Sequence, residues 1–285
     1  MREPINFDDL AELDRQYDIR QAVPDIMEIA DLMAQQSERT RSEHFGYGEF
    51  SYGDSPLQKL DYFPAYPNSP LLIYIHGGYW HAFDKSVFSN VGAAWNRVGV
   101  SVAVINYRLA PAVAMREIVD DVRQSIIWLW RNAVRLGFDK SRMIACGSSA
   151  GGHLTAMMLA TDWTTIGKEL PLNLLKGGAS ISGLHDLGPF LRAPFLKDKV
   201  RLTEQDVEEF SPARRKPATS APIITCVGGD ESPAFHAQNR LIAECWPEAF
   251  KADIPSSGTN HVTVNNELTN TESQLFKAVQ ELLAG

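Results

Sequence analysis

The feature that most constrains the fold of this chain is a series of short, almost unbroken apolar runs. Segments with helical patterning separate the runs, and this alternation is typical of a mostly parallel β-sheet. Strands that helices cover on both faces are apolar along their whole length, as these runs are. The sequence therefore predicts an α/β fold with a mostly parallel central sheet and helices on both faces. The runs are Leu71–His76, Ser101–Tyr107, Met143–Gly147, Gly178–Gly183 and Ile223–Gly229.

Further elements complete the predicted sheet. Glu117–Leu136 has apolar residues at helical spacing and is followed by Gly137, a typical helix C-cap. Residues 45–50 and 58–63 are expected to pair as an antiparallel hairpin at the edge of the sheet. Phe250–Ile254 is the expected last strand, and Asn266–Leu283 is the expected closing helix.

The domain organisation is expected to be simple. The apolar content of 44% suits a single domain over residues 1–285, and no repeat or Gly/Ser linker divides the chain. Residues 1–41 are charged and partly helical from Pro24 onward, and we expect an N-terminal helical extension over the sheet's edge or the mouth of a site. Residues 185–217 are expected to form a short cap insertion that shapes substrate access.

Charge and cysteine content argue against several classes of protein. A net charge of −8 and a sequence pI near 5.4 disfavour nucleic acid or an anionic membrane as a partner. The charged N-terminus and the lack of a long apolar stretch predict a soluble, cytoplasmic protein. Cys146, Cys226 and Cys245 share no CxxC spacing, so neither a disulfide framework nor a thiolate zinc site is indicated. The oligomeric state stays open, a homodimer included.

Ser149 is the candidate nucleophile. It is the serine of a GxSxG frame formed with Gly147 and Gly151, between a predicted strand and a helix-forming segment. A nucleophile elbow needs this tight turn, because small residues on either side relieve backbone crowding and leave the hydroxyl exposed. The alternative is a Gly/Ser turn that merely joins strand to helix. The flanking elements favour the elbow, and Ser148, outside the glycine frame, is expected to help form the turn.

A second glycine-containing turn lies one predicted strand upstream, at His76–Trp80. Acyl transfer builds negative charge on the former carbonyl oxygen, and fixed backbone N–H groups stabilise that charge. In the α/β-hydrolase fold the loop at this position supplies such donors. We therefore assign the oxyanion hole to the amides of Gly78, Tyr79 and Ala150, and expect His76 to brace the loop.

His261 is the candidate base among seven histidines. In the α/β-hydrolase fold the acid and then the histidine follow the serine along the chain. His261 lies in a predicted loop between the last strand and the closing helix, where its ring can reach the elbow. The acid is expected directly after the strand that ends at Gly229, where Asp230 and Glu231 are adjacent. Consecutive side chains of an extended segment point to opposite faces, so one of the two is expected to reach His261.

The motifs together resemble one branch of the α/β-hydrolases, the arylformamidases or kynurenine formamidases, over roughly residues 15–280. They are HGGYW at His76–Trp80, GSSAGGH at Gly147–His153, SGLHDL at Ser182–Leu187 and VGGDESPAFH at Val227–His236. The resemblance implies hydrolysis of N-formylkynurenine to kynurenine and formate without a metal or organic cofactor, while some relatives are aryl or short-acyl esterases. It also favours Glu231 as the acid, because the family's acid directly precedes a Ser-Pro pair.

The chain departs from the family pattern at three positions. Glu231 stands where an aspartate is usual, Ser148 where histidine is frequent, and Asn260 where an acidic residue is common. The longer side chain of Glu231 must retract by one methylene to reach the same imidazole.

The sequence thus predicts a serine hydrolase that removes a small acyl group, such as formyl, from an aryl amide such as N-formylkynurenine through an acyl-enzyme. The main alternative is a carboxylesterase for aryl or short-chain acyl esters, and a binding protein that retains the fold without catalysis is a further one. Trp80 and Phe83 are expected to line an aromatic substrate pocket, with the hydrophobic core as their alternative location. Weaker candidates for the pocket are His81, His185, Phe190 and Phe195.

Overall fold

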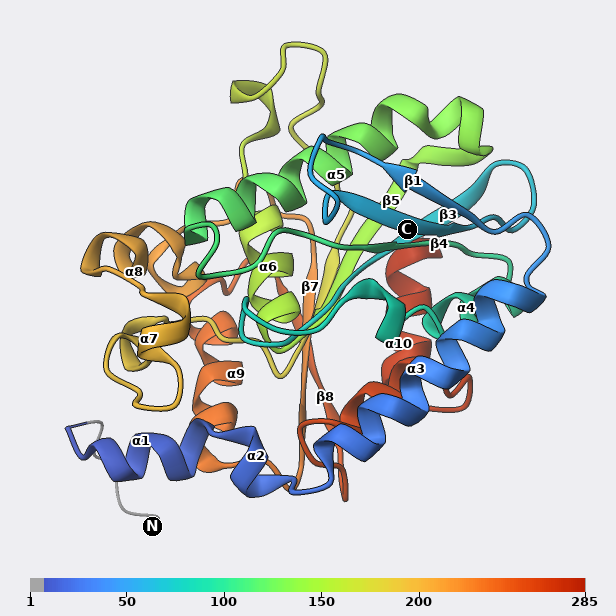
Figure 1. Ribbon diagram of the computed structural model, residues 1–285. Helices are drawn as coiled ribbons and strands as arrows, with labels where there is room; N and C mark the ends of the chain where they lie inside the picture. Colours follow the sequence, from blue (N-terminus) through green and yellow to red (C-terminus); the bar gives the residue numbers. More distant parts are fainter. Residues whose placement is uncertain (1–7, 285) are drawn as a thin grey trace.

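The computed structural model describes residues 8–284, and its central feature is one twisted sheet (Figure 1). The strand order is β1-β2-β4-β3-β5-β6-β7-β8; β1, β2 and β4 pair antiparallel, and all other neighbours pair parallel. The predicted mostly parallel sheet with an antiparallel hairpin at its edge is confirmed. The strands are β1 Gly48–Ser51, β2 Lys59–Phe63, β3 Ser69–Ile75, β4 Ser101–Ile105, β5 Phe138–Ser148, β6 Gly178–Ile181, β7 Ile223–Gly228 and β8 Phe250–Ser256.

Helices cover both faces of the sheet, as Figure 1 shows. The α-helices are α1 Leu10–Tyr17, α2 Ile19–Ala22, α3 Ile26–Glu43, α4 Val91–Arg97, α5 Met115–Leu136, α6 Ala150–Leu159, α7 Lys197–Val200, α8 Glu204–Phe210, α9 Pro233–Cys245 and α10 Gln274–Ala284. Short 3-10 turns are η1 Lys85–Val87, η2 Trp163–Thr165, η3 Gly188–Leu191, η4 Pro212–Arg214 and η5 Thr263–Leu268.

The core has two layers because successive strand side chains point to opposite faces. In β3, Leu71 and Ile73 pack with residues of α5 and α6, whereas Leu72 and Tyr74 pack with residues of α4 and α10. All seven residues of β3 are buried. Full burial of one such apolar side chain contributes about 1.5–3 kcal/mol, so the paired layers hold the central strands firmly.

Helix boundaries follow local capping. Gly137 ends α5 in the left-handed conformation, with φ 82°, as its sequence position predicts. The predicted continuous closing helix over Asn266–Leu283 is wrong, because α10 begins only at Gln274. Ser273 starts it: its Oγ accepts the Phe276 N–H at 2.9 Å and donates to the Glu267 carbonyl at 2.6 Å.

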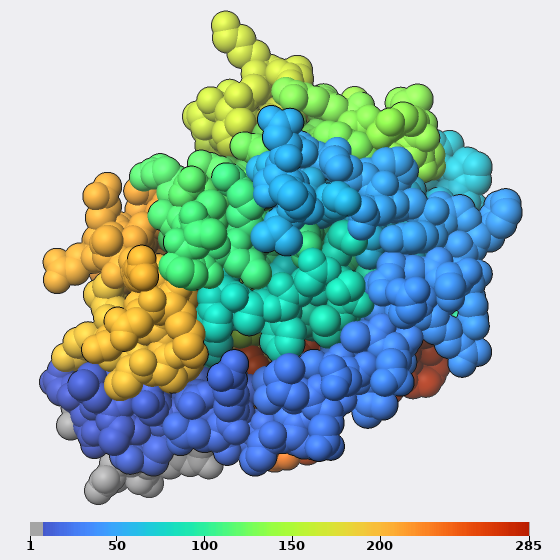
Figure 2. Space-filling model, in the orientation of Figure 1, coloured from blue at the N-terminus to red at the C-terminus, as the bar shows by residue number. Residues whose placement is uncertain are grey.

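The N-terminal helices run along one edge of the molecule, beside part of the 185–217 segment (Figure 2). The first of three separate helices, α1, begins at Leu10, well before Pro24, and the last, α3, ends at Glu43. Residues 1–7 of the expected extension lie outside the described residues. The Gln16 carbonyl accepts from Ser232 Oγ at 2.5 Å, and the Tyr17 carbonyl accepts from the Tyr79 hydroxyl at 2.6 Å. These bonds attach the segment to the loops at the carboxyl ends of the strands.

Candidate active site

Ser149 lies in a strained turn between β5 and α6. Its backbone has φ 58° and ψ −120°, a combination that non-glycine residues rarely adopt. The two frame glycines make this turn possible. A Cβ on Gly151 would lie 1.9 Å from the Ile75 carbonyl oxygen, and a Cβ on Gly147 would lie 2.3 Å from the Gly151 carbonyl oxygen. The GxSxG spacing is therefore a steric requirement of packing this elbow against β3.

Glu231 and His261 are in direct contact. Glu231 Oε2 lies 2.6 Å from His261 Nδ1, while Oε1 accepts from the Ser182 hydroxyl at 2.5 Å and from the Gly228 N–H at 2.7 Å. Burial acts to raise the pKa of Glu231, but the charge of His261 and these hydrogen bonds outweigh it and hold the pKa below its ordinary value. A carboxylate in this position fixes the tautomer of the imidazole and stabilises an imidazolium.

Asp230, the adjacent acid, lies elsewhere. Its side chain is exposed, and its backbone N–H donates to the Thr259 carbonyl at 3.0 Å. Within residues 8–284 its carboxylate has no hydrogen bond or ion pair. Of the two acids that follow β7, Glu231 is the one that contacts His261.

Ser149 and His261 line the same cavity, which has a volume of about 330 Å³. Both side chains are largely buried, and the ring of His261 packs against Phe235 with centroids 4.3 Å apart. Among the described residues no hydrogen bond joins the Ser149 hydroxyl to the imidazole. Such bonds are often long in unliganded enzymes and shorten only when substrate binds.

The predicted oxyanion loop approaches the elbow closely. A Cβ on Gly77 would lie 2.8 Å from the Ser148 carbonyl oxygen, and Gly78 and Tyr79 follow with φ values of 108° and 48°. In the described part of the chain the N–H groups of Gly78, Tyr79 and Ala150 donate to no protein acceptor. Gly78 and Tyr79 line the cavity, and Ala150 opens helix α6, whose N-terminus favours negative charge.

His76 has a structural place behind this loop. Its ring stacks on Tyr107 with centroids 4.3 Å apart, and Nδ1 lies 2.8 Å from the Gly77 carbonyl oxygen. Burial lowers its pKa to about 4, so the imidazole is neutral at pH 7.

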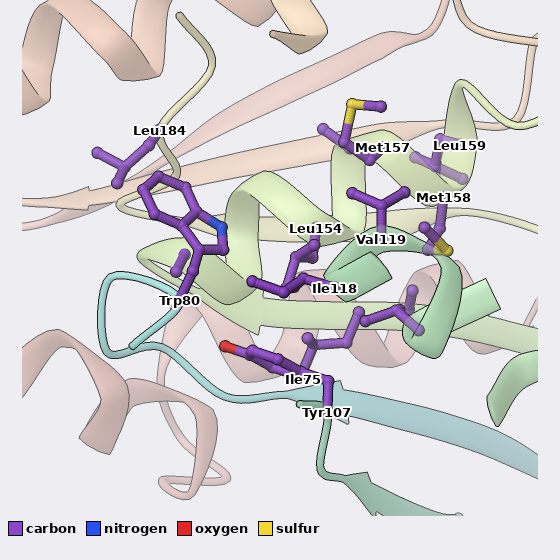
Figure 3. Close-up of a cluster of buried hydrophobic side chains, with 14 of the residues drawn as sticks. Ile75, Trp80, Tyr107, Ile118, Val119, Leu154, Met157, Met158, Leu159 and Leu184 are labelled. Atoms are coloured by element: carbon purple, nitrogen blue, oxygen red, sulfur yellow. The ribbon is translucent and has the colours of Figure 1, made fainter. Parts of the chain in front are cut away.

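The two predicted pocket aromatics lie in different places. Phe83 lines the cavity, but Trp80 is fully buried away from it, and its Nε1 donates to His153 Nδ1 at 3.1 Å. Figure 3 shows the Trp80 ring among buried apolar side chains that include Leu154 and Leu184. The expectation that Trp80 lines the pocket is therefore corrected. Its backbone has a positive φ of 59°, and its ring packs in the hydrophobic core, which was the alternative location.

Of the weaker candidates, His81 and Phe195 line the cavity, whereas His185 and Phe190 are buried in the core or its hydrogen-bond network.

The N-terminal helices supply a wall of the cavity, one of the two positions expected for this segment, although none of its residues was predicted to line the site. Its apolar members are Ile19, Ile26, Met27, Ala30 and Met33. The spacing of Ile26, Ala30 and Met33 is that of one helical face, a signal present in the sequence. What the sequence lacked was any sign of the surface on which this face packs.

Two cations also line the cavity, Arg20 from α2 and Lys199 from α7. Neither side chain forms an ion pair with any residue from 8 to 284. Burial, and then the positive charges of Lys199 and Arg20, lower the pKa of the neighbouring His81. Asp18, the N-cap of α2, lines the cavity as well, so its charged lining holds two cations and one carboxylate.

The described residues contain no group of three or more His, Cys, Asp or Glu side chains that could hold a metal ion. None of the helices within residues 8–284 is both long enough and apolar enough to span a bilayer.

Comparisons with known proteins bear on the family and the fold. A family model described as BD-FAE matches residues 62–173. The kynurenine formamidase of Danio rerio is 29% identical over 87% of this chain and 85% of its own length, and that of Salmo salar is 28% identical over 81% and 80%. The carboxylesterase NlhH of Mycobacterium tuberculosis is 34% identical, but over only 38% of this chain and 34% of its own.

Solved structures give the same fold. A Silicibacter protein that carries a provisional thioesterase name has a TM-score of 0.82 and 29% identity, covering 94% of this chain and 99% of its own. Esterase B of Lactobacillus rhamnosis has a TM-score of 0.68 over 91% of this chain and 96% of its own; at 19% identity this likeness concerns the fold alone. With the sheet and the serine elbow described above, these similarities identify the chain as an α/β-hydrolase enzyme of the kynurenine formamidase-like branch.

Proposed function

We propose that Ser149, His261 and Glu231 form a catalytic triad that removes a small acyl group, formyl in the first instance, from an aryl amide such as N-formylkynurenine. The observation that carries the proposal is the contact of 2.6 Å between Glu231 and His261 beside a cavity that also holds Ser149. A serine hydroxyl becomes a useful nucleophile only when a base accepts its proton, and an oriented imidazole is such a base.

The proposed reaction has two halves. His261 Nε2 takes the proton of Ser149 as Oγ bonds to the acyl carbon, and the amides of Gly78, Tyr79 and Ala150 stabilise the resulting oxyanion. The tetrahedral intermediate then breaks its C–N bond, and His261 gives the proton to the leaving arylamine. Water, deprotonated by the same imidazole, attacks the formyl-serine ester, and formate leaves as Ser149 regains a proton.

The cavity's chemistry supports an aromatic leaving group that carries a carboxylate. Phe83, Phe88 and Phe195 offer ring surfaces, and the remaining wall is mostly aliphatic. Arg20 and Lys199 supply positive charge without an acidic partner among the described residues. A carboxylate attached to an arylamide would satisfy both features.

Carboxylester hydrolysis is the second candidate, and the local similarity to NlhH favours it. Ester and amide cleavage use the same triad and differ in how strongly the leaving group needs a proton. Parallel assays of N-formylkynurenine and 4-nitrophenyl acetate separate the two activities. We expect a higher kcat/KM for N-formylkynurenine; an ester rate that far exceeds the formamide rate would reject formamide cleavage as the main activity.

We also propose that residues 185–217 act as the cap of a single-domain enzyme, that the enzyme works in the cytoplasm, and that it can assemble as a homodimer. Three cysteines without disulfide partners support a reducing compartment. Cell fractionation tests the location, and a secreted protein would contradict it. Sedimentation equilibrium tests the assembly, and a monomer would contradict the homodimer.

A further inference from the structure

We propose that Ser182 is a positioning residue of this triad, which holds the carboxylate of Glu231 so that one oxygen faces His261. The inference rests on the proposed function, because it concerns the acid of the same triad. Ser182 belongs to the SGLHDL motif, and the triad assignment itself gives this motif no role.

The two oxygens of Glu231 have different partners. Oε1 accepts from the Ser182 hydroxyl at 2.5 Å and from the Gly228 N–H at 2.7 Å, and Oε2 is left for His261 Nδ1 at 2.6 Å. Hydrogen bonds to an ionised carboxylate are short and about twice as strong as neutral ones. Two donors on one oxygen fix the rotation of the carboxylate, and with it the direction in which the other oxygen points.

The backbone at Ser182 is built to present this hydroxyl. β6 ends at Ile181, and Ser182 follows with φ 49° and no exposed surface. Its N–H donates to the Cys226 carbonyl of β7 at 2.7 Å, which turns the side chain toward the loop after β7. Glycine would adopt this left-handed conformation without strain but would carry no hydroxyl. A serine here therefore supplies a donor at a position where backbone geometry alone favours glycine.

The arrangement also accounts for a glutamate at the acid position. The Glu231 side chain folds back over its own turn, in which the Glu231 N–H donates to the Gly228 carbonyl at 3.0 Å. A Cβ on Gly228 would lie 3.0 Å from Glu231 Oε1 and 2.5 Å from the Thr259 carbonyl oxygen, so a bare backbone is needed there. The Ser182 hydroxyl and the Gly228 N–H donate to the carboxylate in this folded-back position. An aspartate is one methylene shorter, so we expect it to lose these contacts if it keeps the one to His261.

The test uses the full-length protein with 4-nitrophenyl acetate, which both candidate activities should cleave. We expect Ser182→Ala to lower kcat about 10- to 100-fold, the value of a hydrogen bond to a charged group, and to leave KM within about twofold. The acid limb of the kcat/KM profile should move to higher pH. Without this donor the negative charge is less stabilised, so the Glu231–His261 pair holds its proton more tightly.

Ser180→Ala is the matched control. Ser180 lies two residues earlier, in β6, is equally buried, and donates one hydrogen bond, to His185 Nε2 at 2.9 Å, outside the triad. We expect its kcat to stay within about threefold of wild type, since the loss of a neutral hydrogen bond acts on stability. Ser182→Gly provides a second route if the alanine variant fails to fold, because glycine relieves the positive φ while removing the same hydroxyl.

A double-mutant cycle with Glu231→Asp shows whether Ser182 acts through Glu231. We expect the Ser182→Ala effect on kcat to shrink below about threefold in the aspartate background, because the shorter carboxylate no longer reaches the hydroxyl. An undiminished effect there, or a Ser182→Ala enzyme with the kcat and pH profile of Ser180→Ala, would overturn the role. If Ser149→Ala hydrolyses as fast as wild type, the proposed function fails first, and the role of Ser182 with it.

Discussion

Glu231 has a much more constrained environment than its neighbour Asp230, and the two carboxylates should differ sharply in their effect on catalysis. Glu231→Gln keeps the shape of the side chain but removes the charge that orients the imidazole and stabilises its protonated form. We expect kcat to fall by about 10³- to 10⁴-fold, in line with the loss of a triad acid elsewhere. Asp230→Asn should stay within about threefold, since its exposed carboxylate forms no hydrogen bond or ion pair with residues 8–284.

Steady-state kinetics of the two variants with one substrate provide the measurement, and circular dichroism confirms that each is folded. Equal and mild losses would mean that neither acid supports the base. A larger loss for Asp230→Asn would mean that the observed contact between Glu231 and His261 does not persist during turnover.

At the scale of elements, the helices α2 and α7 bring two cations to the cavity, and neither has an ion pair with a residue from 8 to 284. The turn after β5 and the loop after β8 supply the same cavity with Ser149 and His261. We expect the double variant Arg20→Gln/Lys199→Gln to raise KM for N-formylkynurenine about 3- to 10-fold, because each exposed charge contributes about 0.2–1 kcal/mol. The KM for uncharged 4-nitrophenyl acetate should change by less than about twofold.

Lys197→Gln is the control for this double variant, because Lys197 lies on the same short helix but does not line the cavity. A similar rise in KM for both substrates would contradict a charge-specific role and point to a general disturbance of the cavity wall. Added salt should weaken the binding of N-formylkynurenine in the wild type and have less effect in the double variant.

The elements differ in how far the sequence predicts them. Central strands such as β3 follow from unbroken apolar runs, because helices on both faces leave no polar side. The closing helix was predicted too long, since Ser273 interrupts the segment by capping α10. The N-terminal helices were placed only roughly, because their position depends on long-range bonds such as the one from Tyr79 to the Tyr17 carbonyl.

In the candidate site, too, some residues can be predicted from the sequence and others depend on contacts that only the structure shows. The GxSxG frame and the order of residues along the chain suffice to single out Ser149 and His261, which line one cavity. Spacing alone left Asp230 and Glu231 as equals, because the choice depends on a side chain that folds back over the turn at Gly228. The location of the Trp80 side chain could likewise not be predicted from the sequence, since an indole ring suits a binding pocket and a hydrophobic core equally well.

For the whole molecule, three buried histidines predict that stability declines as the pH falls. Burial lowers the pKa of His76 and His185 to about 4 and that of His153 to about 3. Between about pH 6.5 and pH 4 the unfolded chain binds protons at these positions and the folded chain does not. Each histidine should then reduce the free energy of unfolding by about 1.4 kcal/mol per pH unit of decrease.

Urea unfolding at a series of pH values between 7.5 and 4 measures this decline. We expect the free energy of unfolding to change little above about pH 7 and to fall steeply below about pH 6. The depressed pKa of Glu231 acts in the same direction, because its contribution is present above about pH 4.3 and is lost as the carboxylate protonates at lower pH. A free energy that stays level down to pH 5 would mean that these histidines are accessible to protons in the folded state.

The central claim, that Ser149 is activated by His261, is tested most directly by covalent labelling with a fluorophosphonate and intact-protein mass spectrometry. The wild type should gain one adduct, located by peptide mapping at Ser149; Ser149→Ala should gain none, and Ser148→Ala should still react. A wild-type protein that does not react, or a Ser149→Ala variant labelled to the same extent, would contradict the account.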